Sequence, residues 1–245
     1  MENSNNDFYM NIDDYYNSIP NQADGRGFDN SREIFKRQIN CSFVLFLISV
    51  ALAFLRIKLP FLPKWINTDF SAFPALIASI AYNPFIGAAM CLGKAIAHTL
   101  IHSDFLFFNI VSFLEESVFV LFAGFYYSKI VFIKMSFSSN EEIKQRRKAI
   151  IFFGSLIGTS ISLVIHLVLS VAFSYSLSER FFGLNSPSAL GTYSESLKNI
   201  VNITSLWQGI LIIDLPVLLI KLLVISAAVS LIYPTISPFL HLRKK

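Results

Sequence analysis

The sequence is poor in charge: only 15% of its 245 residues are Asp, Glu, Lys or Arg, whereas a soluble domain carries about 25%. Apolar residues make up 54% of the chain, and 25 residues are Phe. The mean hydropathy is +0.57. This composition excludes an ordinary soluble domain and predicts one polytopic membrane domain at this length.

Other signals are scarce or absent. The two cysteines, Cys41 and Cys91, lie in apolar stretches, where they are typical of small buried filler. We therefore expect no disulfide, no metal site and no bound cofactor. There is no glycine-rich Walker A loop, so the chain is not expected to hydrolyse ATP itself. Basic residues are not interleaved with an aromatic surface, which argues against nucleic-acid binding.

Residues 1–38 differ in composition from the rest. The stretch "MENSNNDFYMNIDDYYNSIPNQADGRGFDNSRE" is rich in Asn and Asp and shows almost no apolar periodicity, so it predicts a disordered cytoplasmic tail. It is not typical of a signal peptide, because no basic start is followed by an apolar core. Residues 39–245 are expected to form the transmembrane domain.

Apolar stretches in this domain predict an all-α membrane protein with six transmembrane helices, the second of them short. The expected ranges are residues 39–59, 70–82, 85–102, 106–133, 149–175 and 216–238. Asp69 and Ser71 are candidates to cap the second helix, and Pro84 suits the first turn of the third. The segment "SLWQGILIID" predicts a short interfacial helix with Trp207 at the headgroup level.

Basic residues gather at three places that six spans put on one side of the membrane. They precede the first helix, crowd the loop after the fourth and end the chain, as Arg32, Lys36, Arg37, Lys144, Arg146, Arg147, Lys148, Arg243, Lys244 and Lys245. The positive-inside rule therefore predicts that both termini are cytoplasmic. The loops around Trp65, Ser103 and Tyr193 are expected to face outward.

The segment "GKAIAHTLIH" places three ionisable residues in an apolar run. Lys94, His98 and His102 lie four residues apart, so they share one helical face. A charge at the bilayer centre costs about 2.5–3.5 kcal/mol on insertion scales, so each residue needs a partner, water or a function. The other ionisable residues of the predicted helices are Glu115, Glu116, His166, Asp214 and Lys221.

Structural and functional interpretations of these residues stay open at this point. Lys94 is expected to pair with Glu115 or Glu116, and Asp214 either caps the last helix at the headgroup level or binds a ligand. Lys221 either binds a ligand or snorkels to the surface. The histidines are each consistent with a structural role as well as a functional one.

Two patterns resemble enzyme motifs without completing them. "HTLIH" has the spacing of a helical metal pair but lacks the Glu of H-E-x-x-H. "EESVFV" is similar to the paired Glu of intramembrane glutamic proteases, whose motif continues with an Arg where this chain has Val120. We therefore expect a protein that is not an enzyme. The alternative is a protease-like enzyme that uses Glu115, Glu116, His98 and His166.

The stretch "DFSAFPALIASIAYNPFIGAAMCLGKAIAHTL", residues 69–100, is more specific. It resembles the substrate-binding S components of energy-coupling factor (ECF) transporters, and among them the riboflavin type. That type reads D-x-S-D-x-P-A-L, then G-P-x-x-G, then K-N-x-x-H. The matching residues are Asp69, Ser71, Pro74, Ala75, Leu76, Pro84, Gly87, Lys94 and His98. "VFVLFAGFYY" and "PVLLIKLLVISAAVSLIYPTISPFLH" are similar to its fourth and last helices, so the resemblance covers residues 41–245.

The resemblance implies a function. An S component captures a vitamin from outside the cell and delivers it through a membrane-embedded T component that is coupled to two ATPase subunits in the plasma membrane. Riboflavin is the favoured ligand. The residues expected to bind or border it are Lys221, Asp214, Trp65, Leu218, Lys94 and His98.

Departures from the pattern bear on the ligand and on docking. Leu218 replaces the Asn of P-x-N-x-x-K, which contacts the flavin in the riboflavin type, so another vitamin or a nucleobase-like compound is the alternative. The family docks on its T component through a lipid-facing strip of small residues on the first helix. The nearest version here is Ser49-x-x-x-Ala53, for which packing within the bundle is the alternative.

Overall fold

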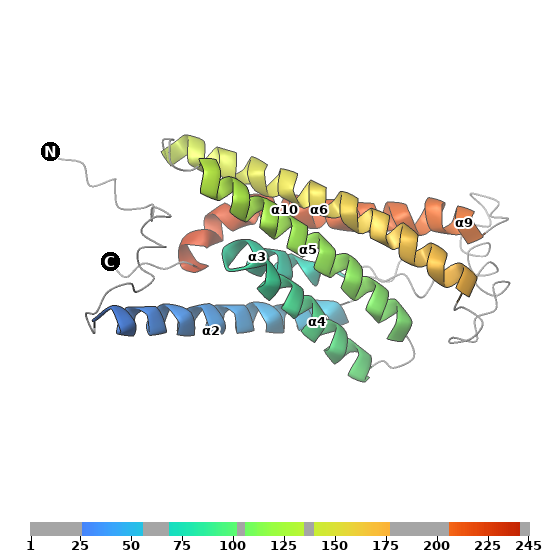
Figure 1. The fold of residues 1–245 in the computed structure, drawn as a ribbon, viewed down its shortest axis with the longest axis horizontal. Coiled ribbons are helices and arrows are strands. Elements are labelled where there is room, and N and C mark those ends of the chain that lie inside the picture. The colour runs from blue at the N-terminus through green and yellow to red at the C-terminus, as the bar shows by residue number, and fades with distance from the viewer. Residues whose placement is uncertain (1–25, 56–68, 102–105, 135–139, 177–205, 241–245) are drawn as a thin grey trace.

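The computed structural model describes residues 26–55, 69–101, 106–134, 140–176 and 206–240, and every element in these ranges is helical (Figure 1). The elements are α2 (Arg26–Phe54), α3 (Ala72–Ala81), α4 (Pro84–Ile101), α5 (Leu106–Lys134), α6 (Asn140–Ser176), α9 (Leu206–Gly209), the π-helical turn η4 (Ile210–Asp214) and α10 (Leu215–Leu240). Within the described ranges, five helices are long and apolar enough to cross a membrane, and α3 is a shorter apolar helix. The predicted all-α membrane fold with a short second helix is confirmed.

Three boundaries differ from the prediction, and one of them is the start of α6, which begins at Asn140 and not at residue 149. Helix α2 begins at Arg26 and ends at Phe54, so the helix extends well into the predicted tail. Residues 1–25, the rest of that tail, lie outside the described residues. The predicted interfacial helix is not separate, because α9 and η4 run directly into α10 and the apolar span reaches from Trp207 to Ser237. A π-helical turn lets the backbone continue here without a break.

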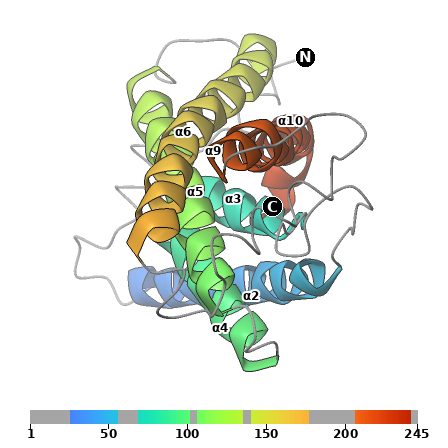
Figure 2. The same cartoon turned by 90° about the vertical axis from the view of Figure 1, so that its right-hand side faces the viewer.

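Helix α3 forms the centre of the bundle. Eight of its ten residues are buried, and it contacts α2, α4, α5 and α10 (Figure 2). Its sequence, "AFPALIASIA", alternates small with larger apolar side chains and has no charge, so it suits a position that is enclosed on every side. The buried core cluster runs from α3 through Phe119 and Val120 of α5 to Leu222 and Ile225 of α10.

One of the two residues predicted to cap α3 accepts a backbone N–H at its start, and the other does not cap it. Ser71 occupies the N-cap position, but its side chain makes no capping hydrogen bond. Its hydroxyl donates to the Asp69 carboxylate instead, and its backbone N–H donates to Asp69 Oδ1 at 3.1 Å. Asp69 is therefore the residue whose carboxylate accepts a backbone N–H at the start of the helix.

Glycine permits a close approach between α3 and α4. A Cβ added at Gly87 would lie 2.6 Å from the Cβ of Ser79 and 2.7 Å from the carbonyl oxygen of Ala75. Real Cβ atoms do not approach other atoms this closely, so α3 and α4 would have to separate. Gly87, the last residue of the G-P-x-x-G pattern, is therefore required in this chain because α3 and α4 pack closely at this position.

We expect Gly87→Ala to lower the free energy of unfolding by about 1–3 kcal/mol, because the Ala75 carbonyl is backbone and cannot rotate away. Gly93→Ala is the matched control on the same helix, since its Cβ would meet only the outer ring atoms of Phe46, which can turn. Chemical unfolding in detergent, followed by circular dichroism, measures both. Equal losses for the two variants would contradict the packing explanation.

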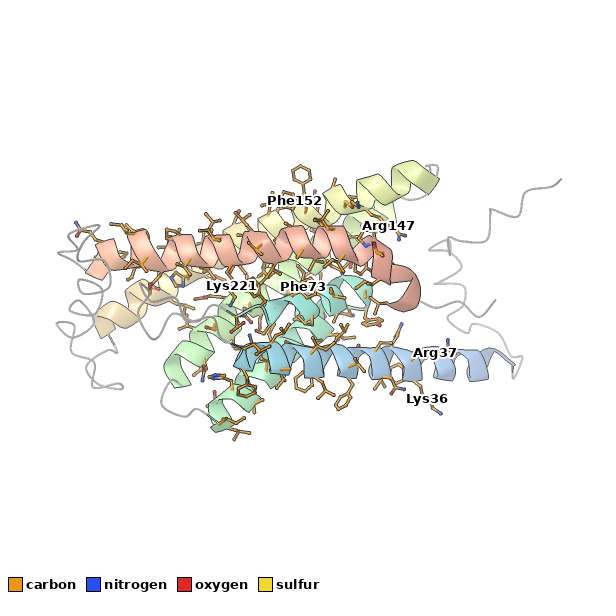
Figure 3. The ribbon with its side chains drawn as sticks, turned by 180° about the vertical axis from the view of Figure 1, so that it is seen from behind. Lys36, Arg37, Phe73, Arg147, Phe152 and Lys221 are labelled. Carbon is orange, nitrogen blue, oxygen red and sulfur yellow. The ribbon has the colours of Figure 1, made fainter. Side chains whose placement is uncertain are left out.

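Both ends of the described chain lie at one end of the bundle. The start of α2, the end of α10 and the junction of α5 with α6 are on the left of Figure 1. Figure 3, from behind, shows Lys36, Arg37 and Arg147 toward this same end, while Lys221 and Phe73 lie further along the bundle. The prediction that the basic clusters share one side is confirmed for these residues, and the positive-inside rule makes that side cytoplasmic.

Cysteine labelling tests this orientation. We predict that Ser139 and Lys245 are cytoplasmic and Tyr193 external, but these three positions lie outside the described residues. Lys36 and Gln208 are exposed positions at opposite ends of the bundle and serve in their place. In a variant without the two native cysteines, a membrane-impermeant maleimide applied to intact cells should label Gln208→Cys and not Lys36→Cys. The reverse pattern would overturn the orientation.

Candidate functional site

Two lysines from different helices bind one buried glutamate. Lys94 of α4 forms an ion pair with Glu116 Oε2, and Lys221 of α10 donates to Glu116 Oε1 at 2.8 Å. The Glu116 side chain is only 1% exposed, and those of Lys94 and Lys221 are 7% and 9% exposed. Snorkelling of Lys221 to the surface is therefore wrong, because its ammonium group points into the bundle and is held there by α5 (Figure 3).

The start of α3 completes the network. Lys94 Nζ donates to Ser71 Oγ at 2.7 Å, and Lys221 Nζ lies 3.5 Å from Asp69 Oδ1. Burial acts to raise the pKa of Asp69, but the Lys221 and Lys94 ammonium groups outweigh it and hold this pKa below its ordinary value. Two cations and two anions thus form one neutral cluster across α3, α4, α5 and α10. Charge balance explains how Lys94 resides in an apolar helix.

Adjacent glutamates on α5 have different partners. Glu115 Oε1 lies 2.7 Å from His166 Nδ1 on α6, and both side chains are largely buried. Consecutive helical residues point about 100° apart, so Glu115 faces α6 while Glu116 faces α4 and α10. The sequence left open which glutamate pairs with Lys94, and the structure selects Glu116.

This division argues against the protease-like alternative. Two catalytic carboxylates act together when they share a proton or a water molecule. Here Glu116 is held by two lysines and Glu115 by His166, so each carboxylate has its own partner. The His98 ring stacks on Phe54 of α2, with centroids 5.8 Å apart. The described residues contain no group of three or more His, Cys, Asp or Glu that could hold a metal.

The remaining predicted binding residues fall in different places. Leu218 is buried in the apolar core cluster, and Asp214 is partly buried at the end of η4, seven residues before Lys221. Asp214 acts electrostatically on His166. Trp65 and His102 lie outside the described residues. The structure therefore brings Lys221 and Lys94 together at Glu116, and it places Asp214 within electrostatic reach of His166.

The predicted docking strip does not face lipid. Ser49 is 0% exposed and Ala53 is 2% exposed, and Ser49 Oγ donates to the carbonyl oxygen of Ser71 at 2.7 Å. The lipid-facing position was wrong, because the small residues of α2 are where this helix packs on α3 and α4. The outer side of α2 carries large apolar side chains, among them Phe43, Val44, Leu47 and Ile48.

The sequence did not indicate two of these contacts. Ser49 was selected for its size, yet its hydroxyl donates to the carbonyl oxygen of Ser71 and so joins α2 to the start of α3. Ser71 was known only as a motif residue, and it bridges Asp69 to Lys94. Serines within apolar helices give no periodic signal, so nothing in the pattern identified their partners.

Comparison with known proteins gives one informative result. No family model matches the chain, and no curated protein matches it in sequence. A solved structure described as the S component of a bacterial ECF transporter matches with a TM-score of 0.55 and 22% sequence identity. The match covers 84% of this chain and 98% of that one. The chain therefore has the fold of an ECF S component, over nearly the whole length of that protein.

Proposed function

We propose that this protein is the substrate-capture S component of an ECF-type vitamin transporter, with riboflavin as the favoured ligand. The observation that carries the proposal is the fold: the similarity to an S component spans 98% of that chain. In this proposal the protein lies in the plasma membrane, binds its ligand from outside and passes it to a T component coupled to two ATPase subunits.

The polar network supports the proposal independently of the overall fold. Asp69, Ser71, Lys94 and Lys221 were identified as motif residues at positions up to 152 apart (221 − 69), and all four belong to one hydrogen-bonded cluster. Residues matched only by chance would not be expected to meet. The four motif residues meet in space, as expected if the motif residues are needed together to build this cluster.

Within this proposal the residues have different roles. Lys221 and Asp214 are the ligand-contacting residues, because they lie on the outer half of the last span and are polar in an otherwise apolar wall. Trp65, which precedes Asp69 in the chain, would cover the ligand. Lys94 and Glu116 hold the network in place. Leu218 supplies apolar surface where the riboflavin type has Asn, and this is the residue that keeps another vitamin or a nucleobase-like ligand as the alternative.

Ligand identification tests the proposal directly. The protein, purified in detergent, should carry a vitamin-type molecule that mass spectrometry identifies, and a flavin would add visible absorbance. Riboflavin added to stripped protein should quench tryptophan fluorescence. A different vitamin in the purified protein would replace riboflavin as the substrate. Absence of any vitamin uptake in cells that also produce a T component and its ATPases would contradict the S-component function itself.

A further inference from the structure

The last span changes its helical spacing near the outer end. In the π-helical turn η4, the Leu215 N–H donates to the carbonyl oxygen of Ile210, which lies five residues before it instead of four. Among the elements that the structure describes, η4 is the only π-helical one. Turns of this kind are rare and frequently lie at functional sites, so η4 is a candidate for a moving part of the molecule.

A proline removes one backbone hydrogen bond from this turn. Pro216 has no N–H, so it donates neither to Ile212 at the α-helical spacing nor to Leu211 at the π-helical spacing. The Leu215 N–H, which is the other possible donor to Leu211, is directed at Ile210. The Leu211 carbonyl group is thus without a regular helical donor at either spacing. A helix bends most easily where its hydrogen-bond ladder is interrupted, and proline and π-turns are usual causes.

The two sides of this turn are packed differently. On the inner side, α10 packs on α6 and α3, and its Leu222 and Ile225 belong to the buried core cluster. Lys221 ties the same part of α10 to Glu116 at 2.8 Å. On the outer side, residues 206–214 form α9 and η4, which among the described elements contact chiefly each other and α10 (Figure 1).

The outer segment is buried along one side only. Ile210 and Ile213 are buried, whereas Leu211 and Ile212 are 50% and 41% exposed. Asp214, its last residue, lies within electrostatic reach of His166 on α6. A segment with few apolar contacts can separate from the bundle at a smaller free-energy cost than the core part of α10.

We propose that residues 206–214 are an outer arm that swings on the turn ending at Pro216, while α10 beyond this proline stays fixed in the bundle. The arm carries Asp214 and the fixed part carries Lys221, so a swing changes the distance between the two proposed ligand contacts. The closed arm then retains the ligand, and the open arm admits or releases it. This control of access rests on the proposed ligand-binding function, whereas the swing itself needs no ligand.

Spin-label distances test the swing in the ligand-free protein. In a variant without the two native cysteines, labels on Gln208→Cys and Val168→Cys measure the arm against α6. Labels on Val224→Cys and Val168→Cys measure the fixed part of α10 against α6, and all three positions are exposed. We expect pulsed electron–electron double resonance to give a broad or divided distance distribution for the first pair and a narrow one for the second. Distributions of equal width would overturn the arm.

Pro216→Leu should restrain the arm, because leucine supplies the missing N–H and suits a continuous helix. Pro234→Leu is the matched control, since Pro234 lies in the same span near its inner end. We expect Pro216→Leu to narrow the distribution between positions 208 and 168 and to slow hydrogen exchange of the amides in residues 210–215 by about tenfold. Pro234→Leu should change neither. An unchanged distribution in Pro216→Leu would overturn the hinge.

Riboflavin kinetics test the control of access. In stopped-flow tryptophan quenching, association and dissociation of riboflavin should both be about tenfold slower in Pro216→Leu than in Pro234→Leu, because a gate acts on both rates. Unchanged rates in a protein whose arm is restrained would overturn the control of access. Failure of the unmodified protein to bind riboflavin would contradict the proposed substrate, whereas the spin-label distances would still support or overturn the arm.

Discussion

Glu116→Gln should be the most damaging single substitution among the described residues of the network. It should lower the free energy of unfolding by about 3–5 kcal/mol, because it leaves two buried ammonium groups with one carboxylate, Asp69, between them. Gln has nearly the same shape as Glu, so the loss of stability measures the loss of the negative charge. Unfolding in detergent, measured by circular dichroism with increasing denaturant, gives the value.

A double variant is the control for this prediction. Lys94→Met combined with Glu116→Leu removes one charge of each sign and leaves Lys221 beside Asp69, at 3.5 Å. Replacing a buried ion pair by apolar residues of similar volume is often neutral, so the double variant should be more stable than Glu116→Gln alone. If the double variant is the less stable of the two, charge balance is not what holds the network.

Lys221→Met should weaken riboflavin binding by about ten- to hundredfold, which corresponds to a lost charge-assisted hydrogen bond of about 1.5–3 kcal/mol. Met keeps the length and the apolar stem of the side chain while removing the charge. An ammonium group has three donor hydrogens. Lys221 directs one at Glu116 at 2.8 Å and one at Asp69 at 3.5 Å, so it can hold the network and still donate the third to a ligand. Tryptophan quenching by riboflavin measures the dissociation constant.

Lys94→Met is the matched control, because Lys94 also binds Glu116 and is also buried. Its second partner is Ser71 Oγ, at the start of α3 and away from α10 in the chain. We therefore expect Lys94→Met to lower stability while changing riboflavin affinity by no more than about threefold, less than the net value of one neutral hydrogen bond. Equal affinity losses for the two lysine variants would mean that Lys221 acts through the network and does not contact the ligand.

The network also constrains how the protein can move. Helices α3, α4, α5 and α10 are each tied to it by at least one charged or polar side chain. A buried, fully paired cluster favours one relative arrangement of these helices, because any other arrangement would leave a charge unpaired in an apolar surrounding. We expect these four helices to move as one body, and α2, which contributes Ser49 to the polar contacts around Ser71, to be less tightly tied.

The sequence by itself determined the class of protein and the order of its helices. Apolar stretches of spanning length and the short segment before Pro84 were enough, because a bilayer permits only helices or closed barrels and each span must be long enough to cross it. It also identified the buried ionisable residues, since any charge inside such a stretch stands out against its neighbours. The shared end of the basic clusters followed from the number of spans.

Only the tertiary structure decided which of these residues meet. Glu115 and Glu116 are adjacent in sequence and equivalent in chemistry, and the rotation of about 100° between them sends one to His166 and the other to Lys94 and Lys221. Ser49 and Ala53 could pack inward or toward lipid, because in a membrane small residues suit either contact, and only the position of α3 beside α2 fixed them inside. Which side chains pair across helices depends on how the helices are placed in space. The spacing of residues along one helix does not give that placement.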